Sequence, residues 1–87
     1  MPNQQEQNIP GPEEVSGSIR AAFDSVSLCE SLIVDNVKTT RTISDVERNK
    51  SHLETMLQKD WFSDALTEEQ RTSINAIIVS SSLFIIV

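Results

Sequence analysis

The sequence predicts an all-α fold: a small three-helix bundle, or a helical hairpin plus a third helix, with an extended polar N-terminal arm and an apolar C-terminal end. Residues 18–87 contain neither Gly nor Pro, whereas an all-β domain needs a turn about every ten residues, and such turns favour Gly and Pro. Apolar residues also recur at helical spacing, behind sequence patterns that cap helices. The 87 residues are enough for one domain at most.

The first twelve residues differ from the rest of the chain. They are rich in Gln, Asn and Pro, and Ile9 is their one large aliphatic residue. Such a segment buries too little apolar surface to offset the entropy lost on ordering. We expect residues 1–12 to form an arm that is either flexible or held by a partner, ahead of a helical domain at 13–80 and an apolar end at 81–87.

The first helix is predicted at 13–38. Pro12 suits a first helical position, and Glu13 and Glu14 suit the positive end of the helix dipole. Apolar residues then follow at steps of three and four, at Ile19, Ala22, Val26, Cys29, Ile33 and Val37.

The second helix is predicted at 45–60. Three threonines between Lys38 and Thr42 interrupt the helical pattern, because β-branched residues are poor helix formers. Ser44 and Glu47 have the spacing of a capping box and would start the helix. Its apolar positions are Val46, Leu53, Met56, Leu57 and Trp61.

The third helix is predicted at 68–80, after a short connection at 60–66. Thr67 and Gln70 form a second capping box. Residues 72–87 carry no charge, and the last five are all apolar and rich in β-formers. We expect the helix to fray near Ser80–Ser82, and residues 81–87 are compatible with either a helix end or a strand.

Two residues bear reactive groups, and neither has the neighbours that catalysis needs. Cys29 lies within an apolar stripe, far from a helix start or a base that would favour its thiolate. His52 has no nucleophile or orienting acid at a recognisable spacing. We therefore predict a protein that is not an enzyme and has no catalytic, cofactor or metal site.

The net charge of the chain indicates which kind of partner it can bind. The net charge is −6, which argues against nucleic acid, because a phosphate backbone is bound by clustered Lys and Arg. A single cysteine cannot form an internal disulfide. So small a domain is only marginally stable by itself, and we expect a protein partner or a homo-oligomer.

The candidate interface residues are aromatic or lie at the C-terminal end. Trp61 and Phe62 are adjacent and cannot both face one side of a helix. Either they anchor a partner, or Trp61 seals the core between the helices while Phe62 covers the loop. Five consecutive apolar residues cannot all face one helical core. We predict that deleting 83–87 abolishes assembly and largely spares helical content. The full set is Trp61, Phe62, Leu83, Phe84, Ile85, Ile86 and Val87.

Residues 48–70 hold a pattern shared with other proteins. Its positions are Arg48-Asn49, His52-Leu53-Glu54, Met56-Leu57, Lys59, Trp61-Phe62, Ala65-Leu66-Thr67 and Gln70. This stretch resembles a segment in small uncharacterised proteins of marine tailed phages, and the resemblance implies a phage accessory or structural subunit with no catalytic residues.

The leading hypothesis is a non-catalytic structural or interaction subunit, located in a virion or in the host cytoplasm and not secreted. The alternatives are a membrane-anchored protein using 72–87, and a soluble inhibitor or regulator of a host protein.

Overall fold

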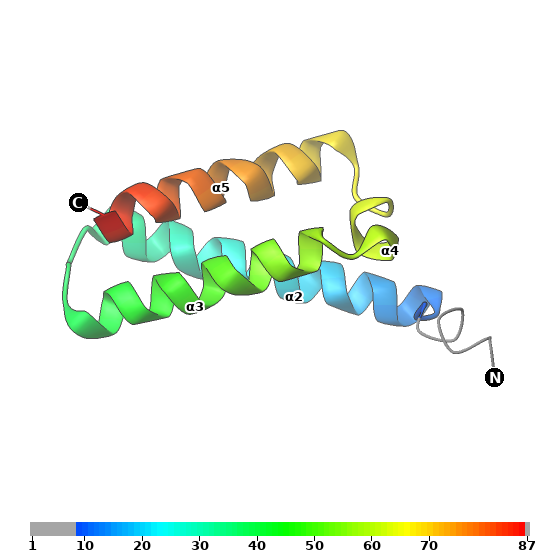
Figure 1. The fold of residues 1–87 in the computed structure, drawn as a ribbon, viewed down its shortest axis with the longest axis horizontal. Helices are drawn as coiled ribbons and strands as arrows, with labels where there is room; N and C mark the ends of the chain where they lie inside the picture. Colours follow the sequence, from blue (N-terminus) through cyan, green and yellow to red (C-terminus); the bar gives the residue numbers. More distant parts are fainter. Residues whose placement is uncertain (1–8, 87) are drawn as a thin grey trace.

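The computed structural model describes residues 9–86, and over that range it contains four helices and no strand. The predicted all-α bundle is thereby confirmed. Three long helices each contact the other two, and a short helix closes one end (Figure 1). Most of the predicted arm, residues 1–8, lies outside the described residues. The helices are α2 (Pro12–Asp35), α3 (Thr40–Leu57), α4 (Asp60–Ser63) and α5 (Glu68–Ile86).

Helix α2 begins as the sequence predicts and ends three residues early. Gly11 is the N-cap and Pro12 occupies the first turn. At the other end, Asn36 adopts a left-handed conformation (φ 55°), and its N–H donates to the carbonyl of Leu32 at 3.0 Å. A left-handed residue stops a helix, and Asn tolerates this conformation better than most residues do. Val37 and Lys38 therefore belong to the loop.

Helix α3 begins five residues before the predicted start, and the predicted capping box at Ser44 and Glu47 is wrong. Thr39 is the N-cap: its side chain accepts from the N–H of Thr42 at 3.1 Å, and its own N–H donates to the Thr42 hydroxyl at 2.9 Å. The threonines that were expected to interrupt a helix instead start one, because their hydroxyls pair with the free N–H groups of the first turn.

Helix α5 starts as predicted and continues past the predicted end. Thr67 and Gln70 form the expected capping box, with reciprocal bonds of 2.9 and 3.0 Å. The serines do not end the helix, and residues 81–86 are helical rather than extended. The Ser82 hydroxyl donates to the carbonyl of Ile78 at 3.0 Å. Packing of Phe84 against the other helices outweighs the β-preference of this segment, since tertiary contacts supply most helical stability in proteins.

The core has two parts along the bundle. The smaller one lies toward the α2–α3 loop and joins Cys29, Val46 and Phe84, one from each long helix. The larger one lies toward α4 and receives side chains from α4 and from the segment that follows it. Its buried members are Ala22, Leu53, Met56, Phe62, Leu66 and Ile74.

Candidate functional site

Helix α5 carries a row of solvent-facing residues that we call the outer face of α5. It consists of Thr72, Ala76, Val79, Leu83 and Ile86, all of which are exposed. Val79, Leu83 and Ile86 retain 60%, 58% and 79% of their accessible surface. Successive members are four or three residues apart, so they lie along one side of the helix. Large apolar groups therefore face solvent over the C-terminal half of α5.

The opposite side of α5 is also apolar. Ile74, Ser81 and Phe84 are buried there against the other helices. A surface helix normally opposes its core side with charged residues, but no charged residue occurs between Thr72 and Ile86. This pattern is typical of a helix that is covered on both sides, and within the described chain only one side is covered.

The two ends of α5 differ in charge. Glu68 and Glu69 occupy the first turn of α5, where carboxylates favour the positive end of the helix dipole. The last turn has no basic residue of its own. Lys38, from the α2–α3 loop, supplies the positive charge: its Nζ donates to the carbonyl of Phe84 at 2.8 Å and lies 4.6 Å from the centre of the Phe84 ring. Helix α5 thus has an acidic first turn and a cation at its last turn, and this cation lies against buried Phe84 on the core side of the helix.

The structure places the two adjacent aromatic residues in different environments. Phe62 is fully buried in the larger core part, while Trp61 is half-buried and packs against that part from outside. The two rings are 6.2 Å apart in an edge-on arrangement. The expectation that Trp61 seals the core and Phe62 covers the loop is reversed. Because Phe62 has no exposed surface, only Trp61 offers area to a partner.

The five residues predicted at the C-terminal interface do not share one environment. Leu83 and Ile86 belong to the outer face and are exposed. Phe84 is buried in the smaller core part and Ile85 packs against it. Val87 lies outside the described residues. Helical geometry sends successive side chains in different directions, so the segment serves the core and the surface together.

Sequence reasoning missed the N-terminal part of the outer face. Ala76 and Val79 were not among the predicted interface residues, although the spacing at 72, 76, 79, 83 and 86 is visible in the sequence. Two apolar sides within the uncharged stretch 72–86 were the signal. Lys38 gave no such signal, because its contact with Phe84 joins residues far apart in the chain.

A groove of about 750 Å³ runs beside the outer face, between α3 and α5. It is open to solvent, and charged side chains of α3 face apolar side chains of α5 across it. Lys50 pairs with Glu54 at 3.2 Å, so part of its charge is already balanced. The lining residues are Ser44, Glu47, Arg48, Lys50, Ser51, Ser82, Ile85 and Ile86.

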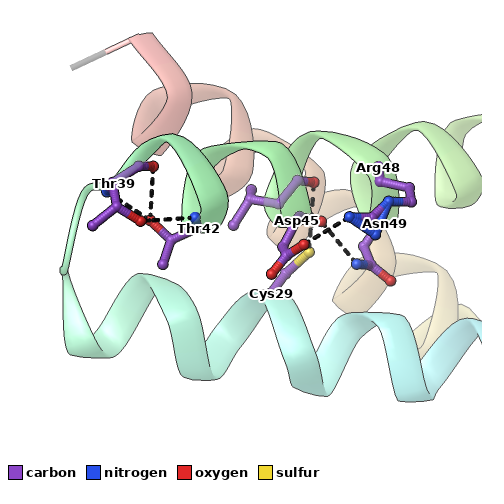
Figure 2. A network of polar contacts seen from close by, with 7 residues as sticks. Cys29, Thr39, Thr42, Asp45, Arg48 and Asn49 are labelled. Atoms are coloured by element: carbon purple, nitrogen blue, oxygen red, sulfur yellow. Dashed lines mark hydrogen bonds and ion pairs between the residues drawn. The ribbon is translucent and has the colours of Figure 1, made fainter.

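The polar contacts along α3 are structural. Figure 2 shows Arg48 paired with Asp45 at 2.7 Å and the Asn49 amide donating to the Asp45 carbonyl at 2.8 Å. Each contact joins residues one turn apart on the same helix, an arrangement that stabilises a helix by a few tenths of a kcal/mol. Of these three residues Arg48 lines the groove, and its guanidinium is paired with Asp45.

The two candidate reactive residues lie in different environments, one buried and one exposed. Cys29 is buried between the helices, with its thiol 4.0 Å from the carbonyl of Val46 (Figure 2). His52 is exposed on α3. Among residues 9–86, no three His, Cys, Asp or Glu side chains gather where they could hold a metal ion.

The stability of the protein is expected to fall in alkaline solution through Cys29. Burial raises the pKa of this thiol above its usual 9.0, and the nearby Ser81 hydroxyl opposes the shift only in part. Above pH 9 the unfolded chain therefore loses the thiol proton first, and the free energy of unfolding decreases until the folded thiol also ionises. Denaturant titrations between pH 7 and pH 10 should show this decrease for the native protein. The Cys29→Ala protein should lack the part of this decrease that comes from the thiol. If the free energy of unfolding fell equally steeply with pH in the two proteins, the prediction would be contradicted.

Comparison with known proteins places the chain in no established group: no protein-family model, curated protein or solved structure matches it. Within residues 9–86, no helix has both the length and the apolar character needed to cross a bilayer.

Proposed function

We propose that this protein is a non-catalytic interaction subunit of a larger assembly and binds its partner through the outer face of α5. The observation that carries the proposal is the exposure of Val79, Leu83 and Ile86 on one side of α5, within the uncharged stretch 72–86. Isolated exposed apolar residues are common on protein surfaces, but an aligned group is typical of a binding surface.

The setting that we propose is a phage particle or its assembly, in the virion or in the host cytoplasm. Support comes from the similarity of residues 48–70 to a segment of small marine phage proteins. The small size and the two-sided apolar helix suit a subunit that is completed by its neighbours.

The proposal is tested by purifying the tagged full-length chain from the cells that normally produce it. Leu83→Glu places a charge within the outer face and should remove the bound partner. Val34→Glu is the matched control, because Val34 is 76% exposed on α2 and outside the outer face. This variant should keep the partner, and recovered capsid or tail proteins would support the phage setting. Loss of the partner from both variants, or from neither, would contradict the proposal.

A further inference from the structure

We propose that the partner of the outer face of α5 is the same face of a second copy of this chain, and that the two α5 helices pair in antiparallel orientation as a symmetric dimer. This inference rests on the interaction role proposed above and names its partner. Three features carry it: the order of side-chain sizes along the face, the absence of charge within it, and the opposite charges at the two ends of α5.

The order of side-chain sizes makes the outer face complementary to itself. In an antiparallel pair centred on Val79, that residue meets its own copy, and Ala76 faces Leu83 of the second copy. Thr72 then faces Ile86 of the second copy. Each smaller side chain lies opposite a larger one, and the alternating steps of four and three residues are those that allow two helices to interlock. In a symmetric dimer each such contact occurs twice.

The charge distribution permits two acidic copies to approach at this face. Each copy has a net charge of −6, so two copies repel one another over most of their surfaces. The segment from Thr72 to Ile86 has no charge and adds no repulsion at the contact. The same absence of basic residues argues against an anionic lipid surface, which attracts Lys and Arg.

The charges at the ends select the antiparallel orientation. A parallel pair would bring Glu68 and Glu69 of both copies together. In the antiparallel pair centred on Val79, Glu69 of one copy lies about 5 Å past Ile86 of the second copy, measured along the helix axis. The Phe84 carbonyl of the second copy points toward this same end, and it binds Lys38 of its own chain. At about 100° per residue, Glu69 and Phe84 also lie on the same flank of α5. Lys38 has donors left after its bond to Phe84, and it is exposed.

The size of the face sets the expected strength of the dimer. One helix laid on another buries less than the roughly 800 Å² per partner of a standard interface. We therefore expect a dissociation constant in the micromolar range, with monomer and dimer in exchange. Sedimentation equilibrium of the purified full-length chain, from about 10 μM to about 1 mM, should show a mass that rises from monomer to dimer.

Substitutions identify the surface and the orientation in the same experiment. Leu83→Glu should weaken the dimer by about 100-fold or more, whereas Val34→Glu should dimerise like the native chain. Lys38→Glu and Glu69→Lys should each weaken it, and the double variant should recover the native dissociation constant. Circular dichroism confirms that every variant is folded before its mass is measured.

Disulfide trapping checks the register. A mixture of Ala76→Cys and Leu83→Cys proteins should form mixed dimers on oxidation, and neither should crosslink efficiently with itself. Self-crosslinking of Ala76→Cys would show a parallel pair and overturn the proposal.

Two results separate this inference from the function on which it rests. A native chain that stays monomeric at every concentration overturns the dimer. If Leu83→Glu nevertheless removes a different protein from the complex isolated from cells, then that protein is the occupant of the outer face and the interaction function stands. If Leu83→Glu changes neither the mass nor the complex, both proposals are wrong.

Discussion

Replacing Phe62 with Ala is expected to lower the free energy of unfolding by about 3–5 kcal/mol. Phe62 is fully buried and is the largest of the fully buried side chains, where it packs among residues from all three long helices. A domain of this length has a total stability of roughly 4–13 kcal/mol, so the variant should lose a large fraction of the stability of the native protein. Urea titrations followed by far-UV circular dichroism measure the change.

Trp61→Ala is the matched control for this prediction. The two aromatic residues are adjacent in α4, but Trp61 is half-buried and lies at the edge of the core. Its removal creates less empty volume and should cost clearly less than the loss of Phe62. A larger loss for Trp61→Ala would mean that Trp61 fills the core instead, which is close to one of the two interpretations that the sequence left open.

Deleting residues 83–87 is expected to destabilise the folded chain itself, by about 3–5 kcal/mol from the loss of Phe84 alone. Phe84 is buried against Cys29 and Val46, and its carbonyl holds Lys38 at the end of the bundle. The expectation from sequence that this deletion largely spares helical content therefore changes, whereas its expected effect on assembly stays a prediction. Thermal unfolding of the truncated chain should begin well below that of the intact chain.

A double substitution separates the surface role of this segment from its core role. Leu83→Ser with Ile86→Ser alters two mostly exposed side chains and leaves Phe84 in place. The free energy of unfolding of this variant should lie within about 1 kcal/mol of the native value, whereas its association with a second chain should be weaker. A truncated chain as stable as the native one, or a double variant as unstable as the truncated one, would refute the assigned packing of Phe84.

The helical fold and several helix ends could be predicted from local sequence. The absence of Gly and Pro after Gly17 excluded a turn-rich fold, and Pro12, Thr67 and Gln70 marked helix starts that the structure confirms. These signals operate within one turn of helix, so neighbouring residues are sufficient to read them.

Local reasoning was wrong where two local signals compete. Ser44 and Glu47 match a capping box, but the cap of α3 is Thr39, which pairs with Thr42. Starting at Thr39 adds more than one turn to α3 and lets Ile43 pack against the smaller core part. Either cap would pair with free N–H groups of the first helical turn. The choice between them depends on how much apolar surface the longer helix buries.

The sequence by itself determined that the chain is helical, acidic and uncharged over its last fifteen or so residues, because composition and spacing of four or fewer residues carry that information. Only the tertiary structure decided that Phe62 is buried and Trp61 half-buried, that Phe84 belongs to the core, and that Lys38 sits at the end of α5. The rotation of each helix about its own axis depends on the other two helices at once. When α5 places Phe84 inward against Cys29 and Val46, helical geometry leaves Leu83 and Ile86 facing outward.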